Sequence, residues 1–384
     1  MHNQAILFAV CAVPVAIWLH LLLGRGLFWS VRRGLPAAPV STPTAVAVAV
    51  VIPARNEADI IGRTITSLLQ QDYDGSLHLF LVDDASSDGT IAVAKRAAAS
   101  LDRDAALTVI PGKPLPAGWT GKMWAVSQGV ELALEKQPDF LLLTDADIEH
   151  APGNLRQLVG WAESQNLDLA SVMVKLQTAT FAEKILIPAF VFFFLMLYPP
   201  AWIANPRRTT AGAAGGCMLI RPDALRQAGG IAAIRREIID DCALAHRVKG
   251  TGGRVRLGLT NDAYSIRSYG GFEEIEKMIS RTAFNQLRHS AALLVATALG
   301  LLLTYILPIA LLCSGTASIM AGGALALGMM AGAYSPMLRF YHRNPLWAVS
   351  LPLVAAFYLY ATLHSAINYW EGHGGEWKDR AQDF

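Results

Sequence analysis

The stretch Leu141–Asp147 (LLLTDAD) is an apolar run that ends in two acidic residues one position apart. Three leucines are typical of the end of a buried strand, which would deliver Asp145 and Asp147 to the carboxyl edge of a sheet, where open α/β sheets bind ligands. Two carboxylates so close together repel each other. A divalent cation held together with a diphosphate would relieve that repulsion. The stretch therefore predicts a metal and diphosphate site, although a strand-ending turn with two solvated aspartates has the same local sequence.

The composition points to a membrane protein. The 384 residues are 53% hydrophobic and only 16% charged, and the apolar residues are clustered. A net charge of +2 gives no electrostatic case for nucleic acid, so we expect no nucleic-acid partner. The four cysteines are scattered and form no C-x-x-C pair, which predicts a reducing compartment without disulfides or a zinc site.

One N-terminal and about three C-terminal apolar runs are long enough to cross a bilayer. The run Ala5–Leu23 is followed, but not preceded, by arginines. The positive-inside rule then places the N-terminus outside and the next domain in the cytoplasm. A cleaved signal peptide would carry its basic residues on the other side of the run. We expect an anchor at residues 1–34, three transmembrane helices within residues 291–369 and a short tail at residues 370–384.

A domain of alternating strands and helices, residues 45–290, lies between these membrane segments, after a linker at residues 35–43. Strands are expected at residues 45–52, 77–82, 107–110, 140–144, 169–175, 215–221, 254–257 and 263–268. Helices are expected at about residues 60–69, 91–100, 121–134, 152–164, 238–249 and 273–288. The alternation predicts a Rossmann-like α/β fold with a mostly parallel sheet and crossover helices.

Residues 185–204 (ILIPAFVFFFLMLYPPAWIA) form an uncharged insertion in this domain. A single crossing would put the two halves of the domain on opposite sides of the membrane, and three prolines interrupt a simple span. We therefore expect an interfacial or re-entrant element on the cytoplasmic leaflet, with a buried core helix as the alternative.

Polar residues follow several predicted strands at one edge of the sheet. They are Asn56, Glu57, Asp83, Asp84, Asp145 and Asp147. In addition, Lys122 stands at the start of a predicted helix, where the helix N-terminus favours a phosphate. Together these groups predict contacts to the base, ribose and diphosphate of a nucleotide. Singly, Asp84 also suits a turn and Lys122 an ordinary helix entry.

A second acidic pair, Asp240 and Asp241, stands at the start of another predicted helix. A carboxylate placed beneath a sugar could remove a proton from an acceptor hydroxyl as a general base. Aspartates at a helix start also simply complement the helix dipole. Further on, Arg288 suits bidentate contact with a diphosphate, but a basic residue flanking a membrane helix has the same sequence signature.

Four motifs, taken in order, resemble those of inverting family 2 glycosyltransferases of the GT-A fold. They are VVIPARNE at residues 50–57, VDDASSDGT at 82–90, DAD at 145–147 and IDDCAL at 239–244. The resemblance covers about residues 45–290. The flanking apolar runs are similar to those of lipid-acting members such as ceramide glucosyltransferases. The segments GKPLPAGWTGK (112–122) and RTAFNQLR (281–288) resemble the bacterial hopene-associated glycosyltransferases.

The resemblance implies a role for each matching position. Asp147, with Asp145, would hold Mg²⁺ or Mn²⁺, and Asp241, with Asp240 beside it, would be the catalytic base. The nucleoside of a nucleotide-sugar, with a lean to UDP, would be bound by Pro53, Ala54, Asn56, Glu57 and Asp84. Asp145, Lys122 and Arg288 complete the expected donor site.

Two family motifs are altered in this chain. The E-D motif of the family reads D-D here. Its Q-x-x-R-W motif reads Asn285-x-x-Arg288-His289, without the tryptophan that processive polysaccharide synthases use near the acceptor. That loss, together with only about three C-terminal spans, argues against a polymer channel.

The implied function is inverting transfer of a sugar from a nucleotide-sugar to a membrane lipid, such as a hopanoid or a related lipid. The protein would be a multi-pass protein of the bacterial inner membrane with a cytoplasmic catalytic domain. Two alternatives remain open: a processive polysaccharide synthase, and a catalytically silent membrane scaffold of the same fold. The sequence predicts no particular oligomeric state.

Overall fold

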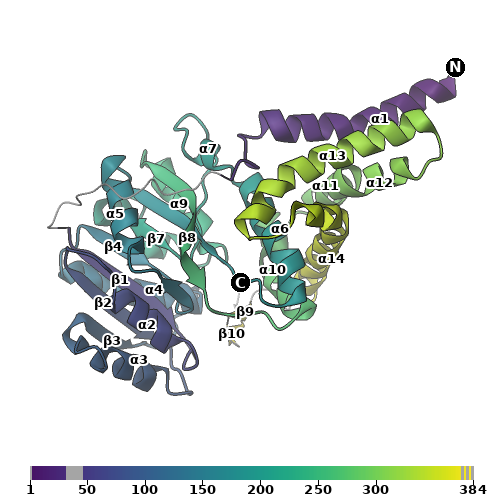
Figure 1. The fold of residues 1–384 in the computed structure, drawn as a ribbon. Coiled ribbons are helices and arrows are strands. Elements are labelled where there is room, and N and C mark those ends of the chain that lie inside the picture. The colour runs from purple at the N-terminus through teal and green to yellow at the C-terminus, as the bar shows by residue number, and fades with distance from the viewer. Residues whose placement is uncertain (1, 32–45, 373–375, 378–379, 382–384) are drawn as a thin grey trace. The chain divides into compact units, whose positions relative to one another are not determined.

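The computed structural model describes residues 2–31, 46–372, 376–377 and 380–381, and the chain divides into two compact units. The α/β unit comprises Arg32–Gln177, Trp202–Ser268 and Glu376–Phe384. The helical unit comprises Met1–Val31, Thr178–Ala201 and Tyr269–Gly375. Figure 1 shows both. The predicted linker at residues 35–43 lies outside the described residues.

Within the described residues, the α/β unit is built on one eight-stranded sheet with the order β3-β2-β1-β4-β7-β6-β8-β5. The strands are β1 (Val48–Ala54), β2 (Leu77–Asp83), β3 (Leu107–Pro111), β4 (Phe140–Leu143), β5 (Ile148–His150), β6 (Leu169–Lys175), β7 (Met218–Ile220) and β8 (Val255–Ser265). The first four neighbours are parallel, as predicted. The other half is mixed, because β7 runs antiparallel to β4 and β6, and β5 runs antiparallel to β8.

Helices cover both faces of this sheet (Figure 1). They are α2 (Ile61–Leu69), α3 (Thr90–Ala99), α4 (Gly121–Glu135), α5 (Asn154–Ser164), α8 (Pro222–Gln227) and α9 (Asp240–Gly250), with 3₁₀ turns at Asp104–Ala106 and Ile231–Ile234. Successive residues of a strand face opposite sides. Val48, Val50 and Ile52 of β1 therefore share one core with α2, α3 and α5. Val51 points to the other face, toward Gly129 of α4.

The approach of α4 to the sheet leaves no room for a side chain at Gly129. A Cβ atom there would lie 2.5 Å from Cγ1 of Val51 and 2.8 Å from Cγ2 of Val82. We expect Gly129→Ala to lower the free energy of unfolding by about 1–3 kcal/mol, less the small gain in helix propensity. Thermal unfolding in detergent measures the change. Gly250→Ala is the matched control, because a Cβ there meets nothing within 4 Å. Equal unfolding temperatures for the two variants would contradict the close approach.

The prediction of separate strands at residues 254–257 and 263–268 is wrong. Both belong to one strand, β8. Asn261 and Asp262 resemble a turn in sequence, yet they lie inside β8, which pairs with β6 on one side and β5 on the other. A shift of register between Met173 and Lys175 of β6 accommodates this stretch. The two residues are part of a bulge, because β8 advances five positions from Leu259 to Tyr264 while β6 advances only two from Met173 to Lys175.

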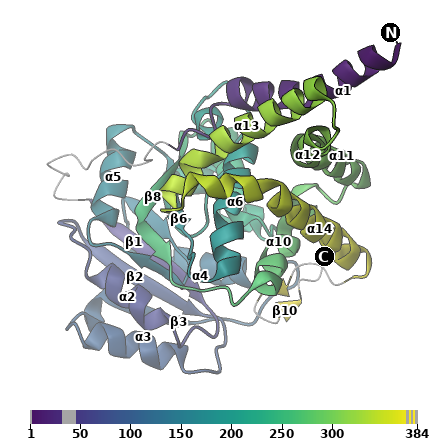
Figure 2. The same ribbon diagram turned by 45° about the vertical axis from the view of Figure 1, so that its right-hand side comes forward.

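The helical unit contains the predicted membrane segments. Its elements are α1 (His2–Leu19) with a π-helical turn at His20–Gly24, α6 (Phe181–Leu197), α10 (Phe272–Gln286), α11 (Ala291–Leu301) with a π-helical turn at Leu302–Ile306, α12 (Leu307–Leu312), α13 (Ala317–Phe340), a 3₁₀ turn at Pro345–Ser350 and α14 (Leu351–Trp370). Figure 2 shows α1 running alongside α13. The short α7 (Pro200–Ile203) crosses the boundary between the units, and β9 (Glu376–Trp377) pairs with β10 (Arg380–Ala381).

Four helical stretches among the described residues are long and apolar enough to cross a membrane. They are Phe181–Ile203, Ala291–Leu312, Ala317–Phe340 and Pro345–Trp370, and the N-terminal Val10–Gly24 is a shorter apolar helix. The last three stretches match the predicted C-terminal runs. These helices are those expected of a membrane protein.

The insertion at residues 185–204 is more regular than its prolines suggested. Pro188 lies inside α6, and the helix ends only at Leu197, shortly before Pro199 and Pro200. The helix begins with a capping box: the hydroxyl of Thr180 accepts a hydrogen bond from the N–H of Glu183, and the carboxylate of Glu183 accepts one from the N–H of Thr180. The expectation that Pro188 breaks the helix is therefore wrong. The interfacial placement of this element stays a prediction.

Candidate active site

The loop Asp145–Asp147 connects β4 to β5 and is fixed from two sides. The hydroxyl of Thr64, on α2, donates a hydrogen bond of 2.7 Å to the carbonyl oxygen of Ala146. The backbone N–H of Ile266, just after β8, donates one of 2.8 Å to the carbonyl oxygen of Asp147. Because these buried backbone groups are paired, the two acidic side chains project from a well-defined loop.

Lys122, in the first turn of α4, links this loop to the second acidic pair. Its ammonium nitrogen Nζ lies 3.0 Å from Oδ1 of Asp145 and 3.3 Å from Oδ2 of Asp240. Burial lowers the pKa of Lys122, but the charges of Asp145 and Asp240 raise it by more, so the ammonium stays protonated. The structure thus brings Asp145, Lys122 and Asp240 together. The predicted contact of Lys122 with a phosphate stays a prediction.

Asp241 lies at the start of α9 beside this cluster, and both of its carboxylate oxygens are oriented. Oδ2 accepts a hydrogen bond of 2.8 Å from the N–H of Gly215, and Oδ1 accepts one of 2.7 Å from the N–H of Cys242. Burial and the neighbouring charge of Asp240 raise the pKa of Asp241 to about 6, against the opposing effect of Lys122 and the two hydrogen bonds. A carboxylate with this pKa is suited to accept a proton near neutral pH.

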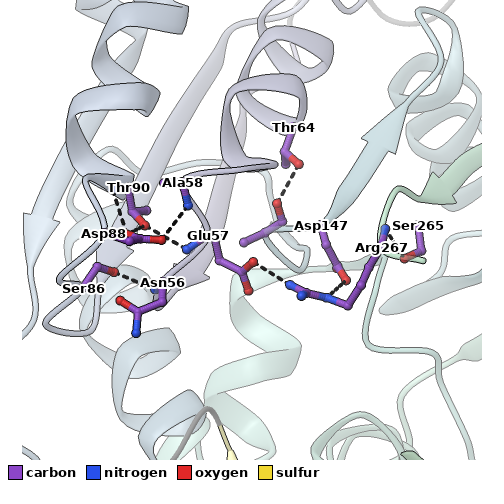
Figure 3. Close-up of polar contacts among 11 residues, drawn as sticks. Asn56, Glu57, Ala58, Thr64, Ser86, Asp88, Thr90, Asp147, Ser265 and Arg267 are labelled. Atoms are coloured by element: carbon purple, nitrogen blue, oxygen red, sulfur yellow. Dashed lines mark hydrogen bonds and ion pairs between the residues drawn. The ribbon is translucent and has the colours of Figure 1, made fainter. Parts of the chain in front are cut away.

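Arg267 joins two further predicted site residues, and Figure 3 shows the three side chains pointing toward one another. Its Nη2 lies 2.5 Å from Oε2 of Glu57, and its Nε lies 3.1 Å from Oδ2 of Asp147. Sequence reasoning missed Arg267, because it is a lone arginine after a strand, far along the chain from both partners. The only local signal is its position directly beyond the end of β8.

The loops after β1 and β2 are tied together at the same edge of the sheet (Figure 3). The N–H of Asn56 donates to the hydroxyl of Ser86, and the N–H of Glu57 donates to the hydroxyl of Thr90. Asp88 accepts from the N–H groups of Ala58 and Thr90. Asp88 thus links the loop after β1 to the start of α3.

Two backbone positions in these loops have an unusual conformation. Asn56 and Ala85 have φ of 52° and 53°, in the left-handed region. Asparagine tolerates this conformation, whereas alanine is strained there. Nearby, Asp84 lies 3.8 Å from the guanidinium of Arg55. Oδ1 of Asp83 is buried and has no hydrogen-bond partner among the described residues. A buried carboxylate oxygen without a partner is a candidate contact for a bound donor group.

A pocket with about 330 Å³ of open space adjoins this cluster. Lys122, Asp145 and Asp240 provide its charged lining, and Pro53, the predicted nucleoside-pocket residue on β1, lines it as well. Its other walls are mostly apolar, and pockets that bind small molecules commonly combine apolar walls with a few polar groups. Ala54, in contrast, is buried in the core next to β2.

The residues present suit a divalent cation whose coordination is completed by a ligand. No group of three or more His, Cys, Asp or Glu side chains among the described residues could hold a metal ion by itself. Burial and the nearby charge of Asp145 raise the pKa of Asp147, so its ionised form requires a cation close by. Hard carboxylate oxygens are the ligands that Mg²⁺ and Mn²⁺ prefer, and substrate phosphates commonly supply the rest.

Two further residues are His150, in β5, and Arg288, which the sequence predicted as part of the donor site. His150 is buried and hydrogen-bonded to Thr144 and Asn154, and burial lowers its pKa to about 4, as for a neutral core histidine. Arg288 belongs to the helical unit, just past the end of α10. Arg288 and His289 both have φ of 52°, and the ring of His289 stacks on Tyr369 with 4.0 Å between centroids. The proposed contact of Arg288 with a diphosphate stays a prediction.

Comparison with known proteins gives one family match. Residues 49–229, slightly less than half of the chain, match the family described as glycosyl transferase family 2. An N-acetylglucosaminyltransferase of Rhizobium leguminosarum bv. viciae is 31% identical over 124 residues, which are 32% of this chain and 27% of that protein. An uncharacterized protein of Methanocaldococcus jannaschii is 30% identical over 121 residues, which are 32% of this chain and 44% of that protein. The matches thus span less than half the length of either relative.

A solved structure extends the similarity to most of the chain. The mannosyltransferase PcManGT of Pyrobaculum calidifontis, determined in complex with GDP-Man and Mn²⁺, aligns with 93% of this chain and 99% of its own. The TM-score is 0.56 and the sequence identity 19%. This likeness shows the fold: a GT-A α/β domain accompanied by apolar helices, as the sequence predicted.

Proposed function

We propose that this chain is a family 2 glycosyltransferase of the membrane that moves a sugar from a nucleotide-sugar to a hydroxyl group of a lipid. The family match at residues 49–229, the GT-A fold and the four apolar helical stretches support the proposal. The observation that carries it is the position of Lys122. Its ammonium contacts both Asp145 of the loop Asp145–Asp147, here called the D-x-D loop, and Asp240 of the acidic pair Asp240–Asp241. The D-x-D loop and the acidic pair that contains the expected base thus share one cation.

The arrangement suits a single displacement with inversion. The lipid hydroxyl oxygen attacks the anomeric carbon from the face opposite the leaving group, and its proton passes to the Asp241 carboxylate. The bond from the anomeric carbon to the diphosphate oxygen breaks, and the nucleoside diphosphate leaves with the electron pair. The N–H groups of Gly215 and Cys242 hold the Asp241 carboxylate in place for this step. Orientation of a base in this way contributes to catalysis alongside its pKa.

Asp147, with Asp145, would hold a divalent cation in this site. When bound, the ion supplies positive charge that stabilises the departing diphosphate. Lys122 would add a second positive charge on the same side. Asn56, Glu57 and Asp84, at the ends of β1 and β2, would contact the nucleoside. The acceptor class that we propose is a hopanoid or related lipid, on the resemblance of residues 112–122 and 281–288.

One assay tests the proposal directly. Purified protein is incubated with a panel of radiolabelled UDP- and GDP-sugars and total bacterial lipids, and labelled lipids are identified by mass spectrometry. We expect one nucleotide-sugar to label one lipid class. A ladder of long saccharide chains would instead favour a processive synthase. No transfer with any donor would favour the silent scaffold.

The pKa of Asp241 predicts how activity depends on pH. The base must be ionised to accept a proton, so kcat/KM should fall about tenfold per pH unit below pH about 6 and level off above it. Initial rates of lipid labelling between about pH 5 and about pH 8 measure the profile. A flat profile through this range would contradict the assignment of Asp241 as the base.

A further inference from the structure

Arg267 is held between two carboxylates whose backbones are fixed by other contacts (Figure 3). Its guanidinium lies 2.5 Å from Glu57 and 3.1 Å from Asp147. The N–H of Glu57 donates to Thr90, and the carbonyl of Asp147 accepts from Ile266. The arginine side chain is long and has several rotatable bonds, and 37% of it is exposed. Arg267 is therefore the part of this bridge that can move.

The atom that Arg267 contacts is one of the two Asp147 carboxylate oxygens that could bind a metal. Nε of Arg267 lies against Oδ2 of Asp147, on the D-x-D loop. Asp145 and Glu57 both place further negative charge near Asp147, so this carboxylate needs a cation in the absence of ligand. A guanidinium and a divalent cation at one carboxylate oxygen repel each other. Either cation, but not both, can therefore occupy this position.

We propose that Arg267 is a resident counter-ion that occupies Asp147 until a divalent cation arrives, and that it then turns to the diphosphate of the donor. The proposal rests on the proposed function, since it assumes that Asp147 binds the metal. A metal that binds without nucleotide must displace Arg267, and this cost weakens binding of the metal. A nucleoside diphosphate offers the displaced guanidinium new oxygen partners that suit its planar fork. Metal and nucleotide therefore favour each other's binding.

Titration of the purified full chain with Mn²⁺ tests this role without measuring transfer. Electron paramagnetic resonance of free Mn²⁺ reports binding, with and without UDP or GDP. We expect Arg267→Gln to bind Mn²⁺ alone roughly 5–50-fold more tightly than the unaltered protein. The gain in Mn²⁺ affinity that the nucleotide produces should be smaller in Arg267→Gln by a similar factor. The gain that remains comes from nucleotide phosphates that bind the metal directly. Arg63→Gln is the matched control, because Arg63 pairs with Glu149 and not with Asp147.

The outcomes separate this role from the proposed function. If Arg267→Gln binds Mn²⁺ alone no more tightly than the unaltered protein, the counter-ion role is wrong. Nucleotide-dependent Mn²⁺ binding in both proteins would then leave the donor site standing. If the unaltered protein binds no Mn²⁺ even with nucleotide, both the counter-ion role and the metal site are wrong. Should the glutamine variant fail to fold, Arg267→Lys carries the same test with a smaller expected gain, because one ammonium cannot bridge both carboxylates in the same way.

Discussion

Asp241→Asn should lower kcat for lipid glycosylation by about 10²–10⁴-fold while leaving the KM for the nucleotide-sugar nearly unchanged. The amide cannot take the proton of the acceptor hydroxyl, but it fills the same space beside Lys122. Its NH₂ group would face one of the two backbone N–H groups that now bind the carboxylate, which costs about 1–3 kcal/mol of stability. Rates must therefore be expressed per folded protein, measured by single-turnover labelling of lipid in detergent.

The control for this variant is Asp223→Asn. Asp223 also lies in the first turn of a helix of the same unit, α8, but it is exposed and pairs with Arg226. We expect it to keep full activity. Retention of activity by Asp241→Asn would show that Asp241 is not the base of the proposed mechanism.

Asp147→Ala should lower kcat/KM by roughly 10²–10³-fold, because stabilisation of the leaving diphosphate by a divalent cation is worth several kcal/mol. It removes the D-x-D oxygen that now contacts Arg267. Unlike Asp241→Asn, it should also weaken binding of Mn²⁺ in the presence of nucleotide. Mn²⁺ titration and labelling rates on the same preparation distinguish the two variants.

Glu149→Gln provides the comparison for Asp147→Ala. Glu149 stands two residues further on, in β5, and binds Arg63 and Tyr264 rather than Arg267. We expect the change to leave Mn²⁺ binding and transfer as they are. Unaltered Mn²⁺ affinity in Asp147→Ala would show that the ion binds elsewhere.

The parts of the fold that the sequence could predict are those governed by local pattern. The apolar runs of β1 and β4 predict buried strands, and both strands are buried. Helix α4 begins at Gly121 as predicted, with Thr120 as its cap. The single strand β8 was not predictable in the same way. Its Asn261 and Asp262 favour a turn locally, but they form a bulge inside a strand whose parts on either side pair with neighbours distant in sequence.

The candidate site shows the same division. Asp145 and Asp241 could be proposed as site residues because motifs mark them, and Lys122 because it begins a helix. The ion pairs could not be predicted. Arg267 lies 210 positions after Glu57 and 120 after Asp147 in the chain, and only the folded sheet brings the three together. Pro188 misled for a related reason: α6 continues through it and packs against α10, α13 and α14 of the helical unit, which are distant in sequence.

The charge of the acidic site has a consequence for the form in which a donor approaches. Five carboxylates face two cationic side chains: Glu57, Asp145, Asp147, Asp240 and Asp241 against Lys122 and Arg267. A free nucleoside diphosphate is itself an anion, so the field of the site slows its diffusional encounter. A donor that already carries its divalent ion is less repelled. The site therefore selects among the ionic forms of one molecule in solution, before any contact with the sugar or the base is made.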